Sequence, residues 1–226
     1  MKKLIDLIFP QLCIACSAHN RIKGDYFCVH CRPTLNFTDH FEVKDNAFKK
    51  RFYGRLDIHA AAALFWYNKG DIVQKMIFGL KYNNQQYIAK ALGTMIGTRL
   101  KNSPIFQDID LLVPVPLHPK KLYKRGFNQS ALLVESISEV TEIPFATHLL
   151  IKNKNTISQT KKSHVDRLLS LEKGFSLNTK YNVAHKNILL VDDVLTTGAT
   201  LEASALPLFD AGIEQLSMMT IAIGKL

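Results

Sequence analysis

The sequence of 226 residues lacks the features that would assign it to a special class of protein. Its longest unbroken apolar stretch covers only residues 60–67, far short of the roughly 18 to 20 residues that a membrane-spanning helix needs. It contains no internal repeat and no low-complexity segment, and its 47% hydrophobic and 21% charged residues are ordinary for a globular protein. We therefore expect no membrane span and no disordered chain. The length fits one α/β or α+β domain with a small appendage, or two modest domains.

Acidic residues are also scarce, since 19 Asp and Glu stand against 29 Lys and Arg and leave a net charge of +10 with neutral histidines. This excess favours polyanionic partners such as nucleic acid or phosphorylated metabolites. The N-terminus begins with two lysines and a short apolar run, but Asp6 interrupts that run and no small-residue cleavage site follows before Cys13. We therefore expect a retained N-terminus and a cytoplasmic location.

All the cysteines lie within residues 13–31, as two Cys-x2-Cys pairs separated by eleven residues. Two such pairs can place four thiolates around one tetrahedral Zn²⁺. Two disulfides or a thioredoxin-type redox pair are the alternatives. Disulfides are disfavoured in the cytoplasm, and a redox motif needs a single pair beside a βαβ unit. The spacing favours a structural zinc site without an open coordination position, formed by Cys13, Cys16, Cys28 and Cys31.

The chain divides into a zinc-binding module that contains the cysteine pairs at residues 1–40, a polar, basic and weakly periodic connector at 41–57, and a periodic main domain at 58–226. In the main domain, apolar runs and helical stripes alternate, which indicates an α/β fold with a mostly parallel sheet flanked by helices. Strands are expected at residues 58–67, 110–115, near 149, 187–191 and 215–223. Helices are expected at residues 71–82, 86–100, 129–141, 165–173 and after 197, with a basic loop at 117–128.

The most informative segment is ILLVDDVLTTGAT at residues 188–200. An apolar run without alternation is typical of a strand covered on both faces, and the two acids that follow lie at its carboxyl end, where open α/β sheets bind ligands. Gly198 permits a tight turn, and the next helix offers free N–H groups to a phosphate. We expect Asp192 and Asp193 to accept hydrogen bonds from the vicinal hydroxyls of a sugar. Its phosphate would lie in the turn formed by Thr196, Thr197, Gly198, Ala199 and Thr200.

Other interpretations of this segment are weaker. A hydrophobic run that ends in two acids also occurs in Walker B motifs, but the sequence contains no GxxxxGK[ST] loop, which an NTPase requires. Receiver domains place their acids near the start of the domain, whereas here the pair lies 34 residues from the end. In the purely structural alternative, Asp192 and Thr196 only cap a turn.

The motif VDDVLTTGAT resembles the signature of type I phosphoribosyltransferases. More narrowly, the chain resembles the ComF family of competence-associated, phosphoribosyltransferase-like proteins. The resemblance covers nearly the whole length, through LIFPQLCIAC, CVHC, LKY at residues 80–82, DLLVPVPLHPKKLYKRGFNQS at 110–130 and VDDVLTTGATL. It implies a type I phosphoribosyltransferase-like fold with a small N-terminal zinc-ribbon-like module, in which the four cysteines bind zinc.

The resemblance also implies roles for single residues. Asp192 and Asp193 would be the catalytic residues that contact the ribose of phosphoribosyl pyrophosphate, and residues 114–116 would form the turn that meets its pyrophosphate. In a transferase, Mg²⁺ would bridge the pyrophosphate and the hydroxyls while cations neutralise the leaving group. The basic residues expected to bind pyrophosphate or DNA are Lys120, Lys121, Lys124, Arg125, Lys161, Lys162 and Arg167.

Two functions are compatible with these residues. Net charge and resemblance together favour a competence-associated protein that binds or escorts incoming single-stranded DNA in the cytoplasm during natural transformation, alongside a helicase or recombination mediator. Its candidate stacking rings are Trp66, Tyr82, Tyr123 and Phe127, for each of which core packing is the alternative. The second function is an active Mg²⁺-dependent phosphoribosyltransferase of nucleotide metabolism that uses phosphoribosyl pyrophosphate.

Overall fold

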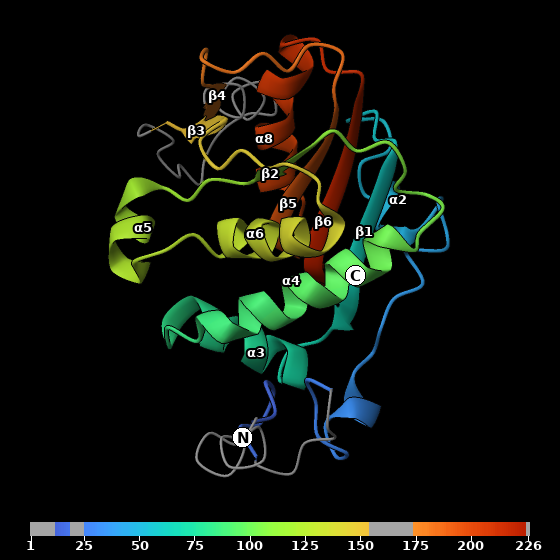
Figure 1. Cartoon of the computed structure of the whole chain (residues 1–226), viewed down its shortest axis with the longest axis vertical. Helices are drawn as coiled ribbons and strands as arrows, with labels where there is room; N and C mark the ends of the chain where they lie inside the picture. The colour runs from blue at the N-terminus through green and yellow to red at the C-terminus, as the bar shows by residue number, and fades with distance from the viewer. Residues whose placement is uncertain (1–11, 19–24, 154–173, 225–226) are drawn as a thin grey trace.

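The computed structural model of the chain describes residues 12–18, 25–153 and 174–224. The helix expected at 165–173 lies outside these residues, and so do Lys161, Lys162 and Arg167. No helix in the described part is long and apolar enough to cross a membrane. The elements of the described part, which Figure 1 shows, are η1 (Arg32–Thr34), α2 (Ala47–Lys50), β1 (Ala60–Tyr67), α3 (Ile72–Tyr82), α4 (Gln86–Lys101), β2 (Leu111–Pro114), α5 (Pro119–Arg125), α6 (Gln129–Thr141), β3 (Leu150–Lys152), β4 (Phe175–Leu177), β5 (Asn187–Leu195), α8 (Ala199–Asp210) and β6 (Gln215–Gly224).

The central sheet contains four strands in the order β1-β6-β5-β2, and every neighbouring pair is parallel. β5 and β6 occupy the middle, where both faces are covered, which explains their nearly continuous apolar sequences. The mostly parallel α/β fold flanked by helices, with a cysteine cluster near the N-terminus, is therefore confirmed.

Successive residues of the strands point into two separate hydrophobic clusters, one on each face of the sheet. Leu189 and Val191 belong to the cluster that α3, α4 and α6 complete, whereas Ile188 and Leu190 belong to the cluster that α2 and α8 complete. Cys13, Phe27 and other residues of the cysteine segment belong to the first cluster. The cysteine segment therefore packs onto the same face of the sheet as α3 and α4.

α4 and α6 pack closely on that face. A Cβ atom at Gly93 of α4 would lie 2.6 Å from the Cβ of Ser136 on α6, and one at Gly97 would lie 2.9 Å from the Cβ of Val140. Only glycine fits at these contacts, so the sequence itself sets the short distance between the two helices.

The basic segment at 117–128, expected as a loop, contains the helix α5. His118 caps its first turn, because its Nδ1 accepts a hydrogen bond from the Lys120 N–H at 3.2 Å, and Pro119 occupies the first helical position. Gly126, at φ 78°, ends the helix in the left-handed conformation. The loop prediction was wrong because α5 buries no residue and so carries no hydrophobic stripe, although its end signals are present in the sequence.

Two strands also differ from the expectation. β5 continues through Leu195, because Asp192 and Val194 still pair with Thr220 and Ala222 of β6. The two acids therefore belong to the last part of the strand instead of following it. The short β4 was not expected, and it pairs antiparallel with β3 in a separate two-stranded sheet.

The segment at 41–57 contains α2, which packs against the sheet. Phe48 and Phe52 are fully buried there. Asn46 caps the helix by accepting from the N–H groups of Phe48 and Lys49, and its amide also donates to the carbonyl of Ala61. This segment therefore contributes to the second hydrophobic cluster, while the division at residues 40 and 57 stays a prediction.

Candidate functional site

The acid pair lies near the carboxyl end of β5, one of the two central strands. The Ser130 hydroxyl, from the first turn of α6, donates to Oδ1 of Asp192 at 3.1 Å, and the Asp193 N–H donates to the same oxygen at 2.8 Å. Burial, and then the negative charge of Asp193, raises the pKa of Asp192 to about 7. Asp192 is therefore a fixed, enclosed carboxyl group that titrates near neutral pH.

Asp193 is held by a lysine that the sequence did not identify as a site residue. The Nζ of Lys81, at the end of α3, lies 2.8 Å from Oδ2 of Asp193, and the side chains are only 21% and 14% exposed. Lys81 is the middle residue of the LKY element, which could have pointed to it. The ion pair holds the end of α3 beside the carboxyl end of β5, where the acids lie.

The turn after β5 is open to solvent and precedes α8. Gly198, at φ 84°, forms the turn, and a Cβ atom there would lie 2.9 Å from the ring of Phe52, so both conformation and space require glycine. The other residues of the turn are exposed, and the N-cap of α8 makes no side-chain hydrogen bond. The backbone N–H groups of this first turn are thus suited to an anion.

Asp192 and the turn face one small hollow of about 20 Å³, lined also by Val194 and Leu195. Thr196, Thr197, Gly198, Ala199 and Thr200 all contribute to its wall. The structure therefore brings together the acid and the phosphate turn that the sequence predicted as one site. A hollow of this size holds about one water molecule, so a sugar ring would lie over the exposed side of the turn.

Two arginines of the 41–57 segment contact the turn and the helix α8 that follows it. The guanidinium of Arg51 donates from Nη1 to the carbonyl of Thr196 at 2.5 Å and from Nη2 to the carbonyl of Gly224. Arg55 pairs with Glu202 of α8 at 2.8 Å and stacks 5.2 Å above the ring of Phe52. These residues were not predicted as site residues, because the basic run at 49–51 is also typical of a solvated connector.

Four of the predicted basic residues lie in the described part of the structure, and the other three, Lys161, Lys162 and Arg167, lie outside it. Lys120, Lys121 and Lys124 are exposed on α5, while Arg125 is half-buried and donates to Oε1 of Gln129 at 2.9 Å. Lys152, at the end of β3, was not predicted. Burial and Lys121 lower its pKa, and Asp192 opposes this shift. Lys121, Lys152 and Asp192 are thus close enough to interact electrostatically.

The turn at residues 114–116 offers nothing to a pyrophosphate through its backbone. Pro114 and Pro116 have no N–H group, and the N–H of Val115 donates to the carbonyl of Val191 at 2.9 Å. The carbonyl of Val115 accepts from Asn128 at 3.0 Å. In these three residues no N–H is left free, so cationic side chains are the better candidates for binding an anion here.

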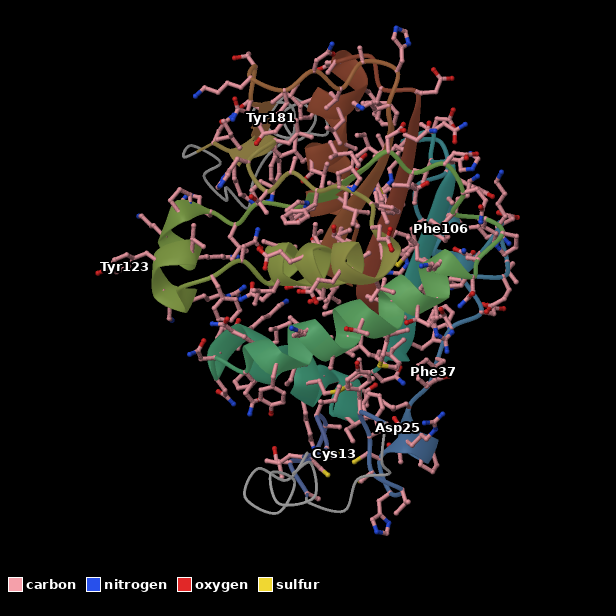
Figure 2. The ribbon with its side chains drawn as sticks, viewed as in Figure 1. Cys13, Asp25, Phe37, Phe106, Tyr123 and Tyr181 are labelled. Carbon is pink, nitrogen blue, oxygen red and sulfur yellow. The ribbon has the colours of Figure 1, made fainter. Side chains whose placement is uncertain are left out.

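The four candidate stacking rings differ in exposure. Tyr123 is 94% exposed and Tyr82 is 57% exposed, whereas Trp66 and Phe127 pack against the two hydrophobic clusters. The structure adds Phe78, which is 56% exposed with its ring centroid 4.8 Å from that of Tyr82. Arg125 lies 5.2 Å above the Tyr82 ring. We call Phe78, Tyr82 and Tyr123 the stacking surface; Figure 2 shows Tyr123 pointing outward from α5.

The cysteine cluster is a separate site, and Figure 2 shows Cys13 at the opposite end of the molecule from Tyr181. The four sulfur atoms lie within 4.8 Å of one another, and those of Cys16 and Cys28 are 3.8 Å apart. A disulfide requires about 2.05 Å, so all four cysteines are free. Zn–S bonds of about 2.3 Å in a tetrahedron place sulfurs about 3.8 Å apart, so the donor set fits one metal ion.

The electrostatics of the cluster are mixed, because the thiol pKa is lowered at Cys28 but raised at Cys16 and Cys31. Hydrogen bonds from the N–H groups of Cys31 and His30 help to lower the pKa of Cys28 to about 6. Burial raises the pKa of Cys31, and the neighbouring cysteines add to this rise. A metal ion would remove this conflict by binding the sulfurs as thiolates.

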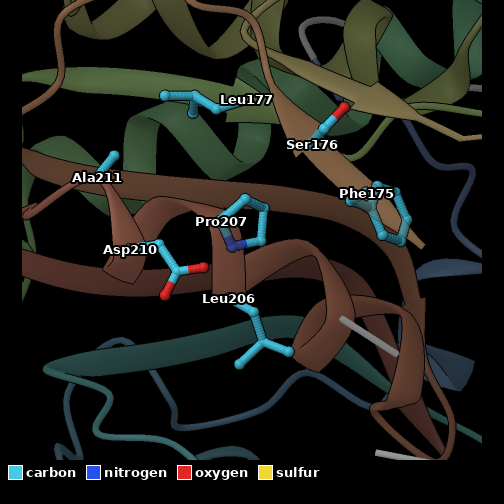
Figure 3. A pocket seen from close by; sticks show the side chains of 7 residues that line it. All are labelled: Phe175, Ser176, Leu177, Leu206, Pro207, Asp210 and Ala211. Atoms are coloured by element: carbon cyan, nitrogen blue, oxygen red, sulfur yellow. The ribbon is translucent and has the colours of Figure 1, made fainter. Parts of the chain in front are cut away.

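Two larger hollows contain none of the predicted site residues. One of about 400 Å³ lies between β4 and α8 and is lined by apolar groups with Ser176 and Asp210 (Figure 3). The other, of about 460 Å³, lies between the cysteine segment and α4 and is lined by residues such as Ile14 and Tyr87. Neither brings together acids, cations and backbone N–H groups as the site beside Asp192 does.

Comparison with solved structures found partial overlaps. Glutamine phosphoribosylpyrophosphate amidotransferase from Bacillus subtilis overlaps 64% of this chain at 19% identity with a TM-score of 0.45, and this chain spans 30% of that enzyme. Adenine phosphoribosyltransferase from Leishmania tarentolae overlaps 64% of this chain and 74% of its own at 13% identity with a TM-score of 0.39. No family model matches the chain.

Comparison with curated proteins found relatives that match most of the chain and others that match about half of it. Competence protein F from Haemophilus influenzae is 30% identical over 215 residues, which cover 93% of this chain and 90% of the relative. Competence protein ComFC from Bacillus subtilis is 29% identical over 206 residues, which cover 89% and 79%. DNA utilization protein YhgH from Escherichia coli is 30% identical over 129 residues, 56% of each chain. On this identity and coverage, the chain belongs to the ComF family of competence proteins.

Proposed function

We propose that the protein binds single-stranded DNA during natural transformation, through the stacking surface and the cations of α5. The observation that carries the proposal is the contact between Arg125 and Tyr82, which joins the exposed rings of α3 to the basic helix α5. Exposed aromatic rings beside cations are the arrangement that binds single strands without reading their sequence. The relatives named for competence and for DNA utilization support the same role.

The charge distribution supports a polyanionic partner. Lys120, Lys121 and Lys124 are exposed within one short helix, and Lys75 is exposed one turn from Phe78 on α3. In single-strand binding, phosphate contacts supply affinity that falls with salt, and stacking supplies affinity that does not. The two contributions can therefore be separated by experiment.

A charge-reversal experiment tests the proposal. We expect the triple substitution Lys121→Glu, Lys124→Glu and Arg125→Glu to weaken binding of a short single strand and to reduce the slope of log K against log salt by about 2, since each single-strand phosphate contact contributes about 0.7. The matched control carries Lys44→Glu, Lys101→Glu and Lys180→Glu, which change the net charge equally at exposed sites elsewhere. Equal slopes for both triple variants would refute the proposed surface.

A second experiment tests the stacking surface. Tyr82→Ala and Tyr123→Ala are each expected to weaken strand binding by about 1 to 3 kcal/mol without changing the salt slope, because stacking involves no counterion release. Tyr53, which is 56% exposed on another part of the surface, is the control residue. An unchanged affinity in both variants would show that the rings do not contact the strand.

A second function, phosphoribosyl transfer, has support from a different observation, namely that Asp192 and the turn at 196–200 line one hollow. Asp192 and Asp193 would orient the ribose and stabilise positive charge at its C1 atom, while Lys121 and Lys152 would neutralise the leaving pyrophosphate. The carboxylates are also the ligand type that Mg²⁺ prefers. Pyrophosphate release across a panel of nucleobases, with calorimetry of phosphoribosyl pyrophosphate and Mg²⁺, tests this function. Binding without release would leave only the binding role.

We further propose that the four cysteines hold a structural zinc ion, that the protein acts in the cytoplasm, and that a helicase or a recombination mediator of the uptake machinery is its partner. The saturated set of four sulfurs supports a structural role, since catalytic zinc keeps a ligand position open. Pull-down of tagged protein from transforming cells, with and without nuclease treatment, tests the partner. Loss of every partner after nuclease treatment would show that DNA alone bridges them.

A further inference from the structure

We propose that the site formed by Asp192, Asp193 and the turn at 196–200 takes the 3′-hydroxyl end of a single DNA strand. The inference rests on the strand binding proposed above and adds which part of the strand occupies this site. The turn would hold the 5′-phosphate of the last nucleotide, and the acids would accept a hydrogen bond from its free 3′-hydroxyl.

The chemistry of the acid pair distinguishes an end from the middle of a strand. Every internal nucleotide carries its 3′-oxygen in a phosphodiester, which has no proton to donate and brings a negative charge. Asp192 already accepts from Ser130 and from the Asp193 N–H, so its carboxyl group is fixed in place as an acceptor. A second phosphate beside two carboxyl groups is repelled, whereas a terminal hydroxyl donates to them.

The size of the hollow also favours the end of a strand over its middle. The space that Asp192 shares with the turn measures about 20 Å³, which is room for about one water-sized group. A continuous strand cannot pass through such a space. A single terminal hydroxyl can enter it while the sugar lies on the exposed residues of the turn.

The stacking surface begins beside this site. Lys81, which pairs with Asp193, and Tyr82, which belongs to the stacking surface, are consecutive residues at the end of α3. Gln129 adds a buried hydrogen-bond donor at the same corner. Its Oε1 accepts from Arg125, and its Nε2 has no partner among the residues that the structure describes. The nucleotides that precede the last one would therefore continue over Tyr82 toward α5.

Competition binding tests the inference. An internally labelled short strand is displaced by unlabelled strands of the same sequence that end in a 3′-hydroxyl, a 3′-phosphate or a 3′-dideoxynucleotide, or that are closed into a circle. We expect the 3′-hydroxyl strand to compete about 10-fold or more better than the 3′-phosphate strand and the circle, because the lost hydrogen bond has a charged acceptor. The dideoxy strand is expected between them, and a 5′-phosphate should make no difference.

Two further arms identify the residues and the chemistry. In the double variant Asp192→Asn, Asp193→Asn, the preference for the 3′-hydroxyl should disappear, while the circle should bind at least as tightly as to the wild type, which shows that the variant is folded. On the wild-type protein, deoxynucleoside 5′-monophosphates should compete and deoxynucleoside 3′-monophosphates should not.

The outcomes separate this inference from the proposed function. Equal competition by the circle and the 3′-hydroxyl strand would overturn end recognition and leave strand binding standing. A preference that persists in the double variant would also overturn it, because the acids would not be its source. If none of the strands binds, both the inference and the proposed strand binding fail.

Discussion

The cysteine cluster and the acid site both gather several ionisable groups, but they do so in opposite ways. In the cysteine cluster, four sulfurs of one type lie within 4.8 Å of one another, and three of the four residues are buried. In the acid site, Asp192 and an exposed turn face a small hollow, and Asp193 beside them pairs with Lys81. The first set can satisfy all its members with one ion, whereas the second keeps hydrogen-bonding groups open. We infer that the cluster serves stability and that the acid site serves binding.

The largest effect is expected from the cysteine cluster. Removing the proposed zinc ion with a chelator, or the substitution Cys28→Ser, should lower the free energy of unfolding by several kcal/mol, because metal-binding energy is folding energy in such sites. Metal analysis together with thermal unfolding measures both quantities. The exposed neighbour His30 is the control, and His30→Ala should keep the metal. A cluster that binds no metal, or a Cys28→Ser variant as stable as the wild type, would remove the contrast between the two regions.

The second effect is a loss of ligand binding with no loss of protein stability. Asp192→Asn and Asp193→Asn should each weaken binding of ribose 5-phosphate about 10-fold to 100-fold, since each removes a charged hydrogen-bond acceptor. The unfolding temperature of the Asp192→Asn variant should not fall below that of the wild type, because the buried carboxyl group that the substitution removes is costly to ionise. Calorimetry and unfolding of the same samples check both parts. A large loss of stability with unchanged binding would assign the acids to the fold instead of the site.

A smaller effect is expected at the turn. Gly198→Ala should weaken phosphate binding and lower the free energy of unfolding by about 1 to 3 kcal/mol, because a residue other than glycine is strained there and its Cβ meets the Phe52 ring. Gly212→Ala is the matched control, since Gly212 has a similar φ of 74° but nothing within 4 Å of its Cβ position. It should lose stability through strain alone and keep its phosphate affinity. Equal losses of affinity in both variants would show that the turn at 198 has no special role.

The last effect is a pH dependence. The pKa of Asp192 is raised from 3.8 to about 7, so the folded protein binds this proton more tightly than the unfolded chain does. The contribution of Asp192 to stability is therefore most favourable below about pH 4 and is lost as the pH rises through about 7. Urea unfolding at intervals from about pH 4 to pH 8 should show the wild type losing stability relative to the Asp192→Asn variant. Parallel curves would contradict a buried, titrating carboxyl group.

Local patterns in the sequence predicted the fold well where burial was strong. The apolar run of β6 and the stripes of α3, α4 and α6 predicted those elements closely, because their side chains fill the two clusters. The apolar run of β5 predicted where that strand begins but not its continuation to Leu195. α5 was missed because it buries nothing, and β4 because three residues carry too little pattern.

The candidate site was predictable only where its residues are neighbours in sequence. Asp192, Asp193 and the turn after them belong to one strand–turn–helix unit, so local rules place them together. Lys81 and Arg51 reach the same place from α3 and from the 41–57 segment, and only tertiary packing brings them there. Long-range contacts of this kind leave no periodic signal in a single sequence.

A crystal structure of the protein with ribose 5-phosphate would decide whether the acid pair and the turn bind a sugar phosphate together. We predict the phosphate against the backbone N–H groups of residues 197–200 and a ribose hydroxyl within hydrogen-bond distance of Asp192 or Asp193. A phosphate bound elsewhere, or a sugar that leaves both acids without contact, would show that these residues do not form one sugar-phosphate site.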